Sequence, residues 1–168
     1  MLRSFVALAV LAGAAWSACA QVPPSENPDW KELEAPPPPA LRTSGLVPLD
    51  VPGSTLRFGV DPASVAVGKD RVVRYVVVAT SASGAVNGIY EGVRCNTGEV
   101  RVFARHNPDS GWVQAEGTQW QPLQSTPNSR YSLQIARTGA CLGQAPNDSA
   151  SQIVRDLRSG VDHRFEKY

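Results

Sequence analysis

The stretch from Tyr90 to His106 constrains the fold most, because it has the pattern of a β-hairpin with a cysteine at its turn. Two segments with alternating apolar residues, 88–94 and 99–106, flank a short polar run. A turn at Asn96-Thr97 predicts three cross-strand pairs of matching chemistry, which are Val93 with Val100, Arg94 with Glu99, and Tyr90 with Phe103. The same register predicts an inner face formed by Ile89, Val93, Cys95, Val100, Val102 and Ala104.

Glu91 falls on this inner face by the same parity. A lone buried carboxylate is costly unless it is paired. We therefore expect Glu91 to lie near a sheet edge with Arg74 or Arg71 beside it, and the alternative is a functional acid.

Further strand and helix signals surround the hairpin. Residues 56–60 are short and apolar, and residues 72–80 are rich in β-branched side chains between two turn signals, as in a central strand. Asn128-Ser129 is a candidate cap for a helix that runs to about Thr138 and is closed by Gly139, and Asn147-Asp148 is a candidate cap for a second helix closed by Gly160. These signals predict an α+β fold, an antiparallel sheet of about four to five strands with one or two short C-terminal helices.

The N-terminus has the order of a secretory signal. Arg3 precedes an apolar run that is too short to span a membrane, and small residues follow it. The small residues Ala18 and Ala20 predict cleavage between Ala20 and Gln21, which gives a periplasmic mature chain without a transmembrane segment. The alternative is a lipoprotein anchored through Cys19, and Trp16 argues against it because a Leu-like residue is usual three positions before a lipidated cysteine.

Cleavage at that site leaves two cysteines, Cys95 and Cys141. An isolated pair in an oxidising compartment predicts a disulfide, which would join the helical layer to the mouth of the hairpin. A metal site built from both cysteines with His106 and His163 is disfavoured, because the chain has no CxxC or HxxxH pair. We expect neither a metal nor another cofactor.

Charge and composition restrict the partners and the domain organisation. Loss of Arg3 leaves 15 of the 16 basic residues against 15 acidic ones, so the mature chain is formally neutral and a nucleic-acid partner is not expected. The predicted organisation is a signal peptide (1–20), a proline-rich extended arm (21–42), one α+β domain (43–160) and a C-terminal tail (161–168). Within the arm, Trp30 is expected to dock back on the domain rather than to wait exposed for a partner.

Several short motifs occur in a characteristic order. They are Phe58–Val65 (FGVDPASV), Gly68, Val73–Tyr75 (VRY), Ser83–Ala85 (SGA), Asn87, Tyr90–Cys95 (YEGVRC) and Gly111-Trp112. As an ordered series from Trp30 to about Cys141, they resemble the CNP1-like family of uncharacterised proteobacterial envelope proteins. The DPxS turn before two strands and a cysteine-bearing hairpin is more loosely similar to small surface-adhesin domains. The resemblance implies a secreted domain with a disulfide, and it implies no activity.

Two classes of function remain open. The first is a non-enzymatic envelope module that binds a protein or a glycan, with Trp30, Trp112 and Trp120 as candidate contacts unless these side chains only cover the core. The second is a hydrolase of envelope polymers that uses Glu91 with Asp61 or Glu99. No GxSxG, HExxH or phosphate-loop motif is present, Asp61 has the context of a turn, and Glu99 is expected to pair with Arg94. We therefore expect a binding module and assign no catalytic residue. The oligomeric state is left open.

Overall fold

The computed structural model describes residues 29–123 and 130–163. The predicted signal peptide with its Ala20-Gln21 cleavage site, Cys19 and the predicted Asn128-Ser129 cap lie outside the described residues.

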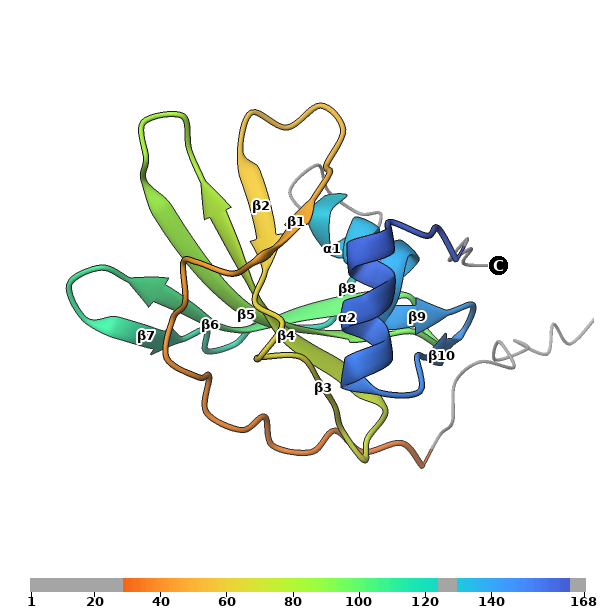
Figure 1. Ribbon diagram of the computed structural model, residues 1–168. Helices are drawn as coiled ribbons and strands as arrows, with labels where there is room; N and C mark the ends of the chain where they lie inside the picture. Colours follow the sequence, from red (N-terminus) through yellow and green to blue (C-terminus); the bar gives the residue numbers. More distant parts are fainter. Residues whose placement is uncertain (1–28, 124–129, 164–168) are drawn as a thin grey trace, which may run out of the picture.

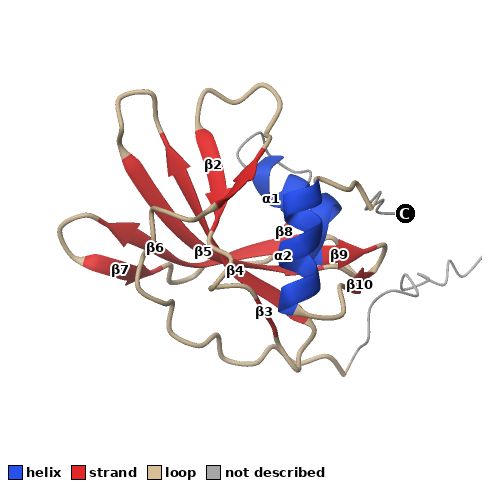
Figure 2. Cartoon of the chain, viewed as in Figure 1, coloured by secondary structure: helices blue, strands red, loops and turns tan. Residues whose placement is uncertain are grey.

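An antiparallel sheet of eight strands forms the body of the structure (Figure 1, Figure 2). Six strands follow one another in the order β1-β2-β4-β5-β6-β7, while β3 pairs with β4 and β8 pairs with β6. The strands are β1 (Val47–Leu49), β2 (Arg57–Val60), β3 (Ala66–Val67), β4 (Val72–Thr80), β5 (Val86–Arg94), β6 (Glu99–Asn107), β7 (Gly111–Gln114) and β8 (Gln121–Pro122). The remaining elements are helix α1 (Arg130–Ile135), a π-helical segment that continues it (Ala136–Ala140), a small hairpin of β9 (Cys141–Leu142) and β10 (Ala145–Pro146), and helix α2 (Ala150–Ser159).

The predicted class is confirmed, since the structure is mainly an antiparallel sheet with two helices and a disulfide. The predicted number of strands is wrong, because the sheet has eight rather than four to five. The strands β1, β3, β7 and β8 contain only two to four residues each. Segments of that length show no recognisable alternation of apolar and polar residues, and the neighbouring long strands determine their pairing.

The long central strands form where β-branched residues are concentrated. Strand β4 begins and ends at the predicted residues, and it is buried along almost its whole length between β2 and β5. In the hairpin of β5 and β6, Val93 pairs with Val100 and Arg94 pairs with Glu99, as predicted. The third predicted pair is wrong, because Tyr90 lies opposite Ala104 rather than opposite Phe103.

A β-bulge causes this difference. The register shifts between Tyr90 and Glu91, so that Phe103 is one extra residue on β6 between the pairs Glu91–Val102 and Tyr90–Ala104. Phe103 and Ala104 both pack with Tyr90 in one core cluster, whereas Val102 packs against the other cluster. The prediction that Ala104 shares the inner face with Val102 is therefore wrong, since the bulge changes the alternation of side chains after Val102.

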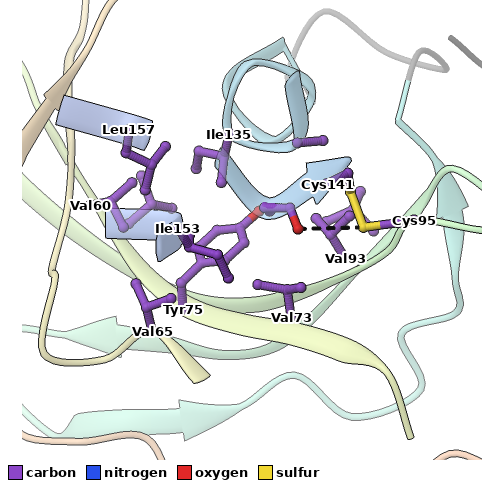
Figure 3. Close-up of a cluster of buried hydrophobic side chains, with 14 of the residues drawn as sticks. Val60, Val65, Val73, Tyr75, Val93, Cys95, Ile135, Cys141, Ile153 and Leu157 are labelled. Atoms are coloured by element: carbon purple, nitrogen blue, oxygen red, sulfur yellow. Dashed lines mark hydrogen bonds between the residues drawn. A yellow bond between two sulfur atoms is a disulfide. The ribbon is translucent and has the colours of Figure 1, made fainter. Parts of the chain in front are cut away.

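One face of the sheet, which we call the helix face, is covered by α1, the π-helical segment and α2 (Figure 1). Its core includes Tyr75 and Val93 from the sheet, Ile135 from α1, and Ile153 and Leu157 from α2 (Figure 3). The predicted disulfide is confirmed on this face. Cys95 and Cys141 are bonded with their Cα atoms 5.6 Å apart, so the end of the hairpin is joined to the segment that follows the π-helical turn.

Helix α2 begins and ends close to the predicted positions. Its N-cap is Ser149, whose hydroxyl accepts a hydrogen bond from the Gln152 backbone, and Gly160 closes it in the left-handed conformation as predicted. The prediction that Gly139 closes the first helix is wrong, because the chain stays helical to Ala140. Gly139 serves close packing instead, since a Cβ atom there would lie 2.6 Å from Leu157 Cγ.

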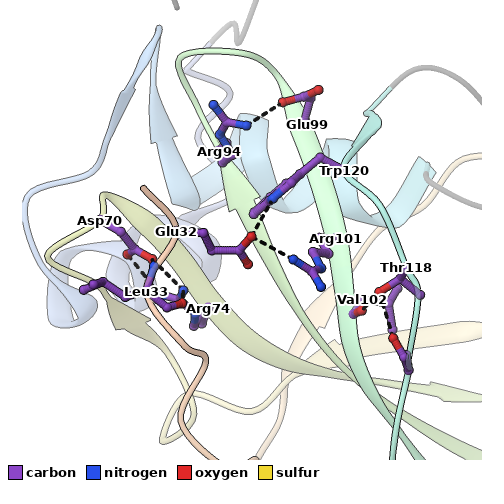
Figure 4. Close-up of polar contacts among 11 residues, drawn as sticks. Glu32, Leu33, Asp70, Arg74, Arg94, Glu99, Arg101, Val102, Thr118 and Trp120 are labelled. Carbon is purple, nitrogen blue, oxygen red and sulfur yellow. Dashed lines mark hydrogen bonds and ion pairs between the residues drawn. The ribbon is translucent and has the colours of Figure 1, made fainter. Parts of the chain in front are cut away.

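The opposite face, which we call the arm face, is covered by residues 29–42 of the proline-rich arm. Trp30 docks on the domain as predicted, and its indole N–H donates to the backbone carbonyl of Asp70 at 2.8 Å. The Leu33 backbone N–H donates to the Asp70 carboxylate, and the Arg74 guanidinium donates to the Leu33 carbonyl (Figure 4). The arm therefore takes the place of a second layer over this side of the sheet.

Asp70 and Arg74 form a buried ion pair at the start of β4, under the arm. Their closest atoms lie 2.6 Å apart, and the side chains are 0% and 4% exposed. Burial raises the pKa of the Asp70 carboxyl, but hydrogen bonds from Arg74, Leu33 and Val72 outweigh burial and hold this pKa below its usual value. The pair joins the arm to the sheet through charge-assisted hydrogen bonds.

In the described ranges 29–123 and 130–163, no helix is long and apolar enough to cross a membrane.

We predict that Cys95→Ser and Cys141→Ser each lower the free energy of unfolding of the oxidised protein by about 4 kcal/mol, because the disulfide closes a long loop in the unfolded chain. The two cysteines are 46 residues apart in the sequence. Urea unfolding should give equal losses for both single variants and for the double variant, which lacks the same bond. A loss with only one of the single substitutions would contradict the prediction.

We predict that Asp70→Ala lowers the free energy of unfolding by about 3–5 kcal/mol, because it leaves the charge of Arg74 buried without its partner. Asp109→Ala removes an exposed carboxylate and should change it by less than about 0.5 kcal/mol. Because the folded pKa of Asp70 is lowered, its contribution should be present above about pH 4 and lost as the pH falls through the folded pKa. Urea unfolding across this pH range tests both points, and equal stability of the two variants at neutral pH would refute them.

Candidate functional site

A pocket of about 790 Å³ opens on the helix face of the sheet. Strands β2, β4, β5 and β6 form its floor, helix α1 forms one wall, and residues 51–56 and 118–121 surround it. Its volume lies within the range of small-molecule sites, and its lining mixes apolar and hydrogen-bonding side chains as such sites do. This pocket is the candidate functional site.

Glu91 lies in the floor of the pocket and is fully buried. One carboxylate oxygen accepts hydrogen bonds from the Tyr75 hydroxyl at 2.7 Å and the Ser132 hydroxyl at 2.7 Å, and the other accepts one from the Tyr131 hydroxyl at 3.0 Å. The predicted pairing with Arg74 or Arg71 is wrong. Arg74 points to the arm face and pairs with Asp70, and Glu91 lies in a central strand rather than at a sheet edge.

The register of the sheet and the position of α1 bring these hydroxyl groups together. Tyr75 on β4 lies directly opposite Glu91 on β5, so both side chains point to the helix face. Tyr131 and Ser132 are consecutive residues in the first turn of α1, about 40 residues further along the chain. Sequence reasoning missed these three partners, although counting the strand pairs back from the turn between β4 and β5 would have placed Tyr75 opposite Glu91.

Three hydroxyl groups and burial set the environment of the Glu91 carboxyl group. Burial raises the pKa of Glu91, and the hydrogen bonds from Tyr75, Ser132 and Tyr131 and the charge of Arg105 oppose this effect without cancelling it. Burial and the neighbouring Glu91 raise the pKa values of Tyr75 and Tyr131, so both phenols stay protonated and remain hydrogen-bond donors. The three hydroxyl donors occupy three of about four acceptor positions of the carboxylate, and they hold its side chain in one orientation.

Two guanidinium groups border the pocket, and sequence reasoning missed both. Arg105 on β6 lies opposite Ile89 and shares the helix face with Glu91, and Arg130 is the first residue of α1. Both side chains are exposed, and neither forms a hydrogen bond or ion pair with any other residue of the described ranges. The pocket therefore presents cations at its rim above a buried carboxyl group.

The second carboxylate of the hydrolase hypothesis is absent from the described lining of this pocket. Asp61 caps a turn, as predicted, by accepting a hydrogen bond from the Ala63 backbone, and it lies 3.7 Å from Arg42. Glu99 pairs with Arg94 at 3.2 Å, also as predicted. Neither carboxylate converges on Glu91. No group of three or more His, Cys, Asp or Glu residues that could hold a metal ion occurs within the described part of the chain.

The three candidate tryptophans lie on the arm face, away from the pocket, and all are partly buried. The Trp120 indole donates to Glu32 at 3.0 Å, and the Trp112 indole donates to the Pro39 carbonyl at 2.7 Å. The Arg94 guanidinium lies 3.8 Å from the centre of the Trp30 ring. Since each indole N–H is bonded to the arm or to Asp70, this arrangement fits the alternative in which the tryptophans cover the core.

We predict that the stability of the wild type relative to Glu91→Gln falls as the pH rises from about 4 to 8. The raised folded pKa of Glu91 means that its contribution is fully present below the unfolded value of about 4.3 and is lost as the pH rises through the folded pKa. Glutamine keeps the shape and does not titrate. Thermal unfolding of both proteins at several pH values measures the trend, with the exposed Glu116→Gln as the control for charge. A difference that does not vary with pH would refute this assignment.

The comparisons with known proteins give one match. Neither the curated proteins nor the solved structures include a match to the chain. The model of the CNP1-like family matches residues 25–158, which cover the arm, the sheet and both helices. By this match over most of its length, the chain belongs to the CNP1-like family.

Proposed function

We propose that this protein is an exported, non-enzymatic module of the bacterial cell envelope that binds a small ligand in the pocket above Glu91. The observation that carries the proposal is the pocket itself, a concavity of about 790 Å³ whose buried carboxylate accepts hydrogen bonds from three hydroxyls of the fold. A binding site needs such a shaped and polar cavity, whereas a hydrolase of the expected kind also needs a second carboxylate near the first.

The periplasm is the proposed location. The secretory signal predicted at residues 1–20 and the buried disulfide between Cys95 and Cys141 both fit an oxidising compartment outside the cytoplasm. The alternative is the same domain held at a membrane through a lipidated Cys19. Both forms would present the same pocket to the envelope.

The proposed ligand is a small molecule or the end of an envelope polymer, rather than a flat protein surface. The tryptophans that would make an aromatic contact patch are engaged with the arm. The pocket, in contrast, combines a stacked pair of aromatic rings, Phe58 and Tyr131 with centroids 4.9 Å apart, with hydroxyl and amide side chains. Such mixed linings fix the orientation of bound organic molecules.

The test is a panel of small fragments of neutral, anionic and cationic charge, followed by amide NMR spectra of the uniformly ¹⁵N-labelled mature protein. We predict that some fragments shift the amide signals of Ile89, Val102 and Tyr131, which line the pocket. Asn87→Trp should abolish these shifts, because Asn87 is an exposed pocket residue and the larger ring fills the cavity. Leu142→Trp, at an exposed strand position outside the pocket, is the matched control and should bind like the wild type.

Two outcomes would overturn the proposal. One is a panel in which no fragment shifts the pocket signals, or in which Asn87→Trp binds as well as the wild type. The other is chemical conversion of a bound fragment, read from its own NMR signals after long incubation and lost in Asn87→Trp. The second result would identify an enzyme that uses the same pocket.

A further inference from the structure

The rim of the pocket carries positive charge that no hydrogen bond or ion pair within the described residues engages. Arg105 and Arg130 both line the pocket, and neither side chain has a hydrogen bond or ion pair to any residue in the described ranges. Other arginines near the sheet are engaged, since Arg74, Arg94 and Arg101 each pair with a carboxylate. Guanidinium groups left free beside a cavity are suited to bind the planar or tetrahedral oxyanions of a ligand.

The backbone also leaves space for one of these groups. Arg130 extends from α1 across to the loop between β1 and β2, where its Nη1 atom lies 3.1 Å from the position that a Cβ atom on Gly53 would occupy. Gly53 has a φ of 74°, in the left-handed region that favours glycine. A side chain at position 53 would require the guanidinium to shift by a few tenths of an ångström.

The acidic group in the pocket offsets these cations only in part, because it is buried beneath the surface that a ligand meets. Glu91 is 0% exposed, and its two oxygens are shielded by Tyr75, Tyr131 and Ser132. A ligand therefore meets hydroxyl and aromatic groups above Glu91 rather than the carboxylate itself. No other Asp or Glu lies among the described lining residues, so the accessible charge of the pocket is positive.

The floor beside the arginines is apolar. Phe58 and Tyr131 stack with their planes 19° apart, and Ile89, Val100 and Val102 are among the other apolar residues of the lining. Burial of an apolar or aromatic body against this surface would contribute about 25 cal/mol for each Å² removed from water. One end of the ligand is thus expected to be apolar and the other to be an anion.

We propose that the pocket binds an amphipathic organic anion, with its carboxylate or phosphate held by Arg105 and Arg130 and its apolar body against Phe58 and Tyr131. The inference rests on the proposed function, because it assigns a ligand class to the same pocket. Carboxylate and phosphate are both oxyanions that a guanidinium recognises, and the test below separates them.

The experiment compares probes that share one phenylalkyl body and differ in the charged end. The probes are 4-phenylbutyrate, 3-phenylpropyl phosphate, the neutral 4-phenylbutyramide and the cationic 4-phenylbutylamine. Their dissociation constants are measured from the amide shifts of the mature protein at low salt. We predict that at least one anion binds about tenfold more tightly than the amide, that the amine binds most weakly, and that the preference for the anion decreases as salt is added. The tighter of the two anions identifies the preferred head group.

Arginine variants test the assignment of residues. Arg105→Gln and Arg130→Gln should each weaken binding of the preferred anion by about three- to tenfold and leave binding of the amide unchanged. Arg158→Gln removes an exposed arginine on α2, outside the pocket lining, and is the matched control for net charge. All three positions are exposed, and the amide spectrum away from the pocket reports whether each variant remains folded.

Each outcome decides between distinct conclusions. If the amide or the amine binds as tightly as both anions, or if Arg158→Gln weakens anion binding as much as the pocket variants do, the ligand class is wrong while the binding site stands. If none of the probes and no fragment of the wider panel shifts the pocket signals, the proposed function fails as well.

Discussion

The buried carboxylate of Glu91 is the constraint on which the arrangement of the helix face depends. A carboxylate in the middle of a sheet needs hydrogen-bond donors, and β4 supplies only one of them through Tyr75. Helix α1 supplies the other two, so its first turn must lie directly over Glu91. A single polar group thus specifies where a short helix packs, which apolar contacts alone would specify less sharply.

The two faces of the sheet are covered by different means. On the helix face, two short helices and a disulfide enclose the core next to the hairpin and leave the pocket open beside α1. On the arm face, an extended segment takes the place of a layer of secondary structure, and it is held by the ion pair of Glu32 with Arg101, by backbone hydrogen bonds and by indole rings. Gly88 makes this close approach possible, since a Cβ atom there would lie 2.6 Å from Leu41 on the arm. Because the arm covers only the opposite face of the sheet, the helix face keeps space for the pocket.

The local residue pattern correctly predicted those elements whose own residues indicate a strand, a turn or the end of a helix. Strand β4, the turn of the β5–β6 hairpin and the C-terminal cap of α2 follow from β-branched runs, from matched cross-strand pairs and from a glycine. The disulfide and the docking of Trp30 followed from general arguments about compartment and exposure. The sequence also singled out Glu91 as unusual. Its partners on α1 were not predictable, because Tyr131 and Ser132 reach it only after distant segments have packed. The short strands were not predictable either, because they have too few residues to show a period.

The bulge at Phe103 has a consequence for what the pocket can recognise. In a regular strand, the side chain of Arg105 would lie on the same face as those of Arg101 and Phe103, beneath the arm. Because of the extra residue, each side chain that follows it on β6 points to the opposite face from the one it would otherwise occupy. One inserted position therefore moves a cation from one side of the sheet to the other without altering any residue of the pocket wall. Whether this cation borders the pocket therefore depends on the strand phase of β6 as well as on the identity of the residue.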